Sequence, residues 1–264
     1  MIELSKQAVI LARGLGRRMR ARTSGLVLTA GQRRIAESGI KVLMPVVDDK
    51  TMLELIVENL SAAGFDEICL VIGPEHSAIR EFCSENELDV RFVIQDEPRG
   101  TADAVLAAEE FIAGELFLVV NSDNLYPVDS LRSLRETNCP ATLAFEHEAL
   151  IRLSNIAEDR IAKFATVEID ASGFLRQITE KPAHVDVDSF ISMNAWLFSP
   201  SIFDACRAIK PSKRGEYELT AAVQYSIDEM GKPFVAVKTA AGVLDLSSRA
   251  DIETVAQLLE TNRH

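Results

Sequence analysis

Short apolar runs alternate with amphipathic segments along the first half of the chain. Four of these runs predict buried strands, at residues 8–12, 67–72, 90–94 and 115–120. The segments between them place apolar residues at helical spacing and predict helices, at residues 51–63, 74–85 and 101–112. Strands and helices that alternate in this way predict a parallel, doubly wound sheet with right-handed crossovers.

The pattern changes character after residue 140. It predicts strands at residues 141–147, 190–198 and 234–238, a hairpin of residues 163–170 and 174–179, and helices at residues 201–209, 217–230 and 251–259. We therefore expect one mixed α/β domain over residues 1–264, Rossmann-like and mostly parallel, with an antiparallel-leaning second lobe. Ligands of such sheets bind beyond the carboxyl ends of the strands.

A glycine-rich turn follows the first predicted strand directly. Gly14 and Gly16 let the backbone turn tightly and leave bare N–H groups, while Arg17 and Arg18 add fixed positive charge. A turn of this kind is a place to hold phosphate. Lys41 leads into a second apolar segment, and a phosphate-binding turn with two separated basic positions favours a triphosphate over a monophosphate.

Two common glycine motifs do not fit this turn. A Walker loop ends in Gly-Lys-Ser or Gly-Lys-Thr, but Arg17 follows Gly16 here. The dinucleotide fingerprint needs glycine or alanine at its sixth position, where this chain has Met19, so an oxidoreductase is disfavoured. Taken alone, the turn could also be a plain surface turn with solvated arginines.

Composition narrows the function classes further. The chain has 264 residues, 47% of them hydrophobic, and a net charge of −12, which argues against a general nucleic-acid binder. Four cysteines without a C-x-x-C pair predict buried thiols rather than a disulfide or zinc framework. The N-terminus lacks a signal-peptide pattern and no stretch is long enough to span a bilayer. We expect a cytoplasmic protein that does not bind membranes.

Two further positions carry candidate chemistry. Asp123 comes just after an apolar strand, at the same edge as the glycine turn, and is a natural Mg²⁺ ligand, although it could merely cap a turn. Gln95 offers both an acceptor and donors suited to the edge of a pyrimidine. Gly100 allows close backbone approach, but residues 98–101 could also be a plain turn before a helix.

Seven segments in order give the chain a resemblance to a known family. Residues 11–19 and 41–46 resemble L-A-A-G-x-G-T-R-(L/M) and K-x-L-x-P-V of the sugar-1-phosphate nucleotidyltransferases. Further matches follow in family order, at residues 95–104, 122–123, 180–182, 214–220 and 243–246. The chain is therefore similar to glucose-1-phosphate thymidylyltransferases and UDP-sugar pyrophosphorylases.

The resemblance implies a glycosyltransferase-A-like nucleotidyltransferase fold, with a nucleotide-binding half at residues 1–140 and a sugar-phosphate-binding half at residues 141–264. It implies joining of a nucleoside triphosphate, UTP or dTTP, to a sugar 1-phosphate, with possible homo-oligomers. The implied roles are catalytic for Arg18, Lys41 and Lys181, nucleotide-binding for Leu11, Ala12, Gly14, Gly16, Gln95, Gly100 and Thr101, sugar-binding for Glu180, Asn194 and Arg214, and Mg²⁺-binding for Asp123 and Asp245.

The chain departs from the family pattern at several positions. Arg13 and Arg17 stand where the family has alanine and threonine or serine, Trp196 replaces a glycine, and Ser247-Ser248 replaces Gly-Thr. Residues 20–40 form a longer segment than the family has at this place, and residues 30–38 within it predict a helix. The segment is interpreted either as a mobile cover over the site or as a plain surface insertion. A non-catalytic nucleotide-binding relative, and a cytidylyl- or guanylyltransferase for another phosphorylated acceptor, stay open as alternatives.

Overall fold

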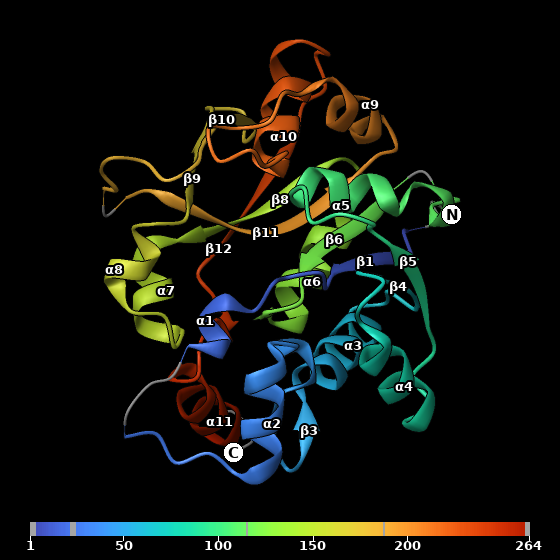
Figure 1. Cartoon of the computed structure of the whole chain (residues 1–264). Coiled ribbons are helices and arrows are strands. Elements are labelled where there is room, and N and C mark those ends of the chain that lie inside the picture. The colour runs from blue at the N-terminus through green and yellow to red at the C-terminus, as the bar shows by residue number, and fades with distance from the viewer. Residues whose placement is uncertain (1–3, 22–24, 115, 187, 262–264) are drawn as a thin grey trace.

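A nine-stranded sheet forms the centre of the computed structural model, which describes residues 4–21, 25–114, 116–186 and 188–261 (Figure 1). Its first four strands are parallel: β1 (Gln7–Leu11), β4 (Glu67–Ile72), β5 (Val90–Ile94) and β6 (Phe117–Asn121). β1 pairs with β4 on one side and with β6 on the other, and β4 pairs with β5.

The second half of the chain extends this sheet beyond β6. Its strands are β8 (Ala141–Glu146), β11 (Phe190–Phe198) and β12 (Val235–Thr239), and the hairpin strands β9 (Ala165–Ile169) and β10 (Leu175–Thr179). β11 runs antiparallel to β6, β8 and β9, while β12 is parallel to β8. The expected mostly parallel sheet with an antiparallel-leaning second lobe is thus confirmed.

Helices cover both faces of the sheet (Figure 1). One face carries α3 (Met52–Ala62), α4 (Ser77–Glu85) and α6 (Val128–Glu136), and the other carries α5 (Thr101–Ala107), α9 (Ser201–Ala208) and α10 (Leu219–Asp228). Successive side chains of β1 point to opposite faces of the sheet, so Ala8 and Ile10 pack into one core and Val9 and Leu11 into the other.

Smaller elements complete the chain. They are the helices α1 (Arg17–Arg20), α2 (Ala30–Ser38), α7 (His147–Leu153), α8 (Glu158–Ile161) and α11 (Asp251–Thr261), the 3-10 helices η1 (Lys41–Leu43) and η2 (Glu109–Phe111), and the short strands β2 (Pro45–Val47), β3 (Lys50–Thr51), β7 (Asn124–Leu125) and β13 (Leu244–Asp245).

Most predicted elements are confirmed, and the errors have local causes. The helix predicted from residue 74 begins at Ser77, because the backbone N–H of His76 closes a turn onto the Gly73 carbonyl. The helix predicted over residues 101–112 ends at Ala107 and continues as a separate 3-10 turn. The predicted helix of residues 30–38 forms, with Thr29 and Gln32 as a capping box.

The strand order locates the binding crevice. After β1 the chain moves outward to β4 and β5, and then returns to the other side of β1 to form β6. The order therefore reverses between β1 and β6, and a crevice opens beyond their carboxyl ends. The glycine turn follows β1 and Asp123 follows β6, so both lie at this switch point.

Candidate active site

A cavity of about 490 Å³ opens at the switch point and gathers most of the predicted site residues. Those that line it are Leu11, Gly14, Gly16, Arg18, Lys41, Gln95, Gly100, Thr101, Asp123, Glu180, Asn194 and Arg214. Ala12, Lys181 and Asp245 do not line it. Segments from both halves of the chain therefore meet around one space.

The glycine turn contains one position whose conformation only glycine adopts readily. Gly16 has φ of 58°, and an added Cβ would overlap the carbonyl oxygen of Gly39. Gly14 is different, because an added Cβ would meet only the Lys41 side chain, at 3.7 Å from Cε. Gly16 is thus needed for the turn itself, whereas Gly14 keeps the cavity wall open.

Ala12 serves the sheet rather than the cavity. Its backbone N–H donates to the carbonyl oxygen of Val71 at 2.9 Å and extends the β1–β4 pairing by one residue. This N–H is therefore already used within the fold.

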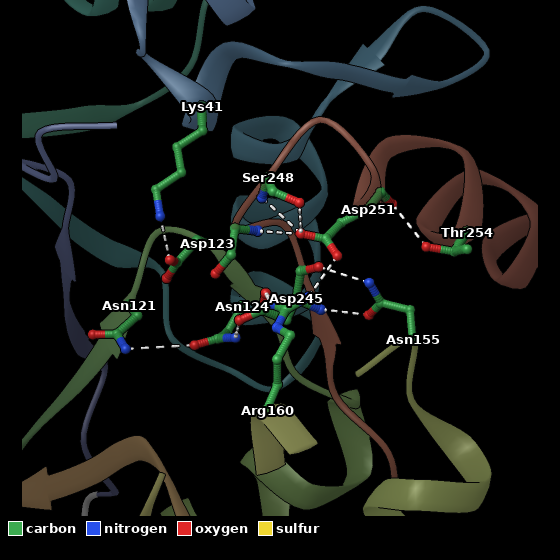
Figure 2. A network of polar contacts seen from close by, with 11 residues as sticks. Lys41, Asn121, Asp123, Asn124, Asn155, Arg160, Asp245, Ser248, Asp251 and Thr254 are labelled. Atoms are coloured by element: carbon green, nitrogen blue, oxygen red, sulfur yellow. Dashed lines mark hydrogen bonds and ion pairs between the residues drawn. The ribbon is translucent and has the colours of Figure 1, made fainter. Parts of the chain in front are cut away.

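Lys41 and Asp123 form an ion pair in the cavity wall (Figure 2). The Lys41 Nζ donates to Asp123 Oδ2, and the two side chains are 16% and 21% exposed. Lys41 stands at the start of η1, and Asp123 lies between β6 and β7. The pair brings a cation and a carboxylate together in the wall of the cavity that the glycine turn also lines.

Asp245 lies in a separate, more buried network (Figure 2). The Arg160 guanidinium donates to Asp245 Oδ1, and also to Asp251 Oδ1 at 2.6 Å. Asn124 Nδ2 donates to Asp245 Oδ2 at 3.2 Å, across the β7–β13 pair. Burial raises the pKa of Asp245, Asp123 nearby adds to this rise, and Arg160 opposes it.

The backbone of Asp245 is clamped as well. The Asn155 amide accepts from Asp245 N at 2.8 Å and donates to the Asp245 carbonyl oxygen at 2.7 Å. Both Asn155 and Arg160 come from the segment around α8, which no sequence motif marked. The network is apparent only once the fold brings positions some 90 residues apart together.

The two predicted metal ligands differ in how well they fit a divalent cation. Mg²⁺ is usually bound by one or two carboxylates together with substrate phosphates and water. Asp123 fits this role, since it lines the cavity beside the glycine turn. Asp245 is adjacent on a paired strand, but both its oxygens already accept hydrogen bonds. Among the described residues, no cluster of three or more candidate side chains could hold a metal.

Gln95 is fixed by two acceptors. Its Nε2 donates to the Gly100 carbonyl oxygen at 3.1 Å and to Asp103 Oδ2 at 2.7 Å, and the residue is only 4% exposed. Because both partners can only accept, the amide orientation is determined. The amide oxygen of Gln95 is the group left for another partner.

Gly100 and Thr101 also join two helices. Gly100 has φ of 127°, and an added Cβ would overlap the backbone of Tyr217. Thr101 Oγ1 accepts from the N–H of Leu219 at 2.9 Å, at the start of α10. Packing between α5 and α10 therefore already explains why these two residue types stand here.

Three glutamates surround one arginine in the cavity lining. Arg214 Nη2 lies 2.8 Å from Glu218, 3.7 Å from Glu216 and 4.0 Å from Glu180. Burial and the neighbouring Glu218 raise the pKa of Glu180. Lys181 follows with φ of 46° and an exposed side chain outside the cavity lining.

Trp196 does not occupy the cavity. It is fully buried, stacks on Phe198 at 5.6 Å between ring centroids and meets Phe234 edge-on. Its Nε1 donates to Asn194 Oδ1 at 3.3 Å. Asn194 has φ of 59° where the β11 register shifts. The tryptophan is thus a core residue that helps to hold Asn194 at the cavity.

Comparison with known proteins agrees with this geometry. A family model described as "Nucleotidyl transferase" matches residues 7–261. The chain belongs to the nucleotidyl transferase family. The resemblance to sugar-1-phosphate nucleotidyltransferases is confirmed by its relatives, which include a glucose-1-phosphate thymidylyltransferase of Streptomyces griseus, 32% identical over 84% of this chain and 57% of the relative. The chain spans little more than half the length of that relative.

Two further likenesses cover nearly the whole chain. A UTP–glucose-1-phosphate uridylyltransferase of Haloferax volcanii is 25% identical over 96% of each protein. The crystal structure of a UDP-glucose pyrophosphorylase complexed with UDP-glucose matches with a TM-score of 0.75, 19% identity and coverage of 98% of this chain and 100% of that one. The fold of this nucleotidyl transferase family member is therefore shared along its length.

Two other expectations can be compared with the structure. All four cysteines of this family member are free; Cys69, Cys83 and Cys206 are buried, as predicted, whereas Cys139 is partly exposed. In the part of the chain that the structure describes, none of the helices is both long and apolar enough to cross a bilayer.

Removing Arg160 should destabilise the fold. Arg160→Met leaves Asp245 and Asp251 as buried carboxylates without their cation, which costs about 3 kcal/mol of unfolding free energy and lowers Tm by about 6–12 °C. Lys163→Met is the matched control, because it removes an exposed ion pair with Asp159 on the same segment and should change stability by less than about 0.5 kcal/mol. If thermal denaturation shows the same change in Tm for both variants, this role of Arg160 is contradicted.

The two glycines of the turn should respond differently to alanine. Gly16→Ala forces a side chain into a left-handed conformation against Gly39, so we expect a loss of about 2 kcal/mol or more. Gly14→Ala adds a methyl group at ordinary contact distance and should leave Tm within about 2 °C of the parent. Equal melting temperatures for the two variants would show that position 16 accepts an alanine side chain as well as position 14 does.

Proposed function

We propose that the chain joins a nucleoside triphosphate to a sugar 1-phosphate and releases pyrophosphate. The observation that carries this proposal is that one cavity brings together the glycine and arginine turn, the Lys41–Asp123 pair, the Gln95 amide and Arg214 with its glutamates. Family membership supports the reaction class, and two relatives bear names of thymidylyl and uridylyl transfer to glucose 1-phosphate.

UTP or dTTP is the favoured nucleotide. The free acceptor of Gln95 suits the imino N–H of uracil or thymine, and the names of those two relatives agree. Glu180, Asn194 and Arg214 are proposed to contact the sugar, since they line the same cavity.

The chemistry needs little beyond positioning and charge neutralisation. A sugar-phosphate oxygen forms a bond to the α-phosphorus, the bond from that phosphorus to the bridging oxygen breaks, and pyrophosphate leaves with the electron pair. The attacking phosphate has a second pKa of about 6, so it is mostly deprotonated at neutral pH and needs no general base.

The chain's own cations would hold the phosphates. Arg18 and the N–H groups of the glycine turn are proposed to bind the leaving pyrophosphate, and Lys41 to neutralise the α-phosphate. Because Lys41 is paired with Asp123 in the ligand-free chain, an incoming phosphate competes for its ammonium group. Lys181, next to the cavity residue Glu180, is proposed to reach the incoming sugar phosphate.

Mg²⁺ is proposed as the cofactor, with Asp123 as its main ligand. When bound, the ion would neutralise charge on the phosphates of both substrates. Asp245 is proposed as a second ligand, which requires the Arg160 contact to loosen. Because the Arg160 contact occupies Asp245, it also favours a second candidate function, in which the chain binds a nucleotide without turning it over.

Pyrophosphate release tests the proposal directly. The full chain is incubated with Mg²⁺ and a grid of UTP, dTTP, CTP, GTP and ATP against a panel of sugar 1-phosphates. Release in the UTP or dTTP rows supports the proposal, and release confined to CTP or GTP supports a different transferase. A triphosphate that raises Tm without any release supports the binding relative.

Asp123→Asn should nearly abolish turnover while the protein still folds. The amide keeps the shape of the carboxylate but loses the charge that pairs with Lys41 and binds the cation, so we expect kcat to fall by about 100-fold or more. Asp129→Asn, which changes an exposed carboxylate on α6, is the control and should keep full activity. Normal turnover of Asp123→Asn would remove its metal role.

A further inference from the structure

Arg13 is a buried cation with an incomplete set of partners. Its side chain is only 7% exposed and lines the cavity. Nη1 donates to the Gln95 carbonyl oxygen, and Nη2 lies 3.4 Å from Glu75 Oε2. The Nε atom is buried without a hydrogen-bond partner. Among the described residues, the other such side-chain atoms belong to His147 and Ser226, which do not line the cavity.

An unpaired N–H in a cavity wall indicates a missing acceptor. Buried polar groups in folded proteins are nearly always satisfied, and an unmade hydrogen bond costs free energy. Arginine can only donate, so the missing partner must carry a lone pair. The Nε atom itself is covered by protein atoms, so a ligand in the cavity supplies this acceptor only when the guanidinium turns toward the cavity.

The position of Arg13 shows which part of a nucleotide it faces. Its partners Glu75 and Gln95 follow β4 and β5, on one side of β1, whereas Asp123 follows β6 on the other side. The guanidinium therefore points away from the Lys41–Asp123 pair, where the phosphates are proposed to bind. Glu75 and the Gln95 carbonyl hold it there.

The neighbouring Gln95 completes a two-part wall. Asp103 and the Gly100 carbonyl occupy its amide N–H groups, which leaves its amide oxygen as an acceptor. Arg13, which donates to the Gln95 backbone carbonyl, adds a donor to the same cavity lining. The wall is complementary to a base edge that has an acceptor beside a donor.

Building on the proposed function, we propose that Arg13 is a specificity-determining residue that donates from Nε to a carbonyl oxygen of the nucleotide base, while Gln95 accepts from the adjacent imino N–H. The class of base is one with a carbonyl next to an imino N–H, as in uracil and thymine. Cytosine has an amino group at the position of this carbonyl, so the amino N–H would face the Arg13 N–H and two donors would meet. A buried mismatch of this kind is a strong basis for rejection.

The test uses UTP analogues in which sulfur replaces one base carbonyl oxygen, at position 2 or at position 4. These analogues keep the imino N–H but weaken one acceptor. In the wild-type chain, we expect the position-4 analogue, whose sulfur replaces the oxygen that cytosine lacks, to lose about 10-fold in kcat/KM relative to UTP, and the position-2 analogue to change little. In Arg13→Met the same replacement should change kcat/KM by less than about 2-fold, because the donor is gone.

Arg13→Met should also weaken UTP itself. We expect KM to rise about 10- to 100-fold with kcat within about 3-fold, and the preference for UTP over CTP to shrink by a similar factor. Arg80→Met is the matched control, since Arg80 is an exposed arginine of α4 outside the cavity, and it should behave as wild type. Arg13→Lys keeps the charge without the guanidinium Nε–H and serves if the methionine variant does not fold.

The results separate this inference from the proposed function. If wild type turns over UTP but Arg13→Met and Arg13→Lys show the same sulfur effect as wild type, or if wild type prefers CTP, the inference is overturned and the transferase stands. If no triphosphate is turned over, calorimetric titration with UTP and its analogues decides. Binding with an Arg13-dependent sulfur effect supports the inference without the reaction, and absence of binding overturns both.

Discussion

The parallel pairing of β1 with β4 on one side and β6 on the other is the constraint on which the site depends. The register places Leu11 opposite Val71 and Asn121, so that three loops leave the sheet at the same level. The glycine turn, Glu75 and Asp123 come from those loops. Two apolar layers hold the strand in place, because alternate side chains of β1 enter opposite cores.

Three carboxylates at or near the cavity are each held by a cation. Asp123 is paired with Lys41, Asp245 with Arg160, and Glu218 with Arg214, although the chain as a whole carries a net charge of −12. An anion that binds Lys41 or Arg214 would therefore compete with these carboxylates. Its affinity would depend on how tightly each carboxylate holds its cation.

The sequence predicted the fold better than the details of the site. Apolar runs such as residues 67–72 are bounded by strong breakers, so strand positions could be read directly, and the capping box at Thr51 and Glu54 marked a helix start. The cavity residues were identified because they lie in motifs that resemble those of the family. Arg160 and Asn155 were missed, because a network of polar contacts between distant segments has no local sequence signal.

The residues that depart from the family pattern have different structural roles. Trp196 packs into an aromatic core and supports Asn194. Ser247 and Ser248 donate their N–H groups to Asp251 Oδ2 at 3.1 and 2.6 Å, which anchors the start of α11 and the loop after Asp245. Arg13 and Arg17 instead line the cavity, as does Ser247. The departures therefore keep the supporting contacts around Asn194 and Asp245 in place, while they change the surface that a ligand in the cavity would meet.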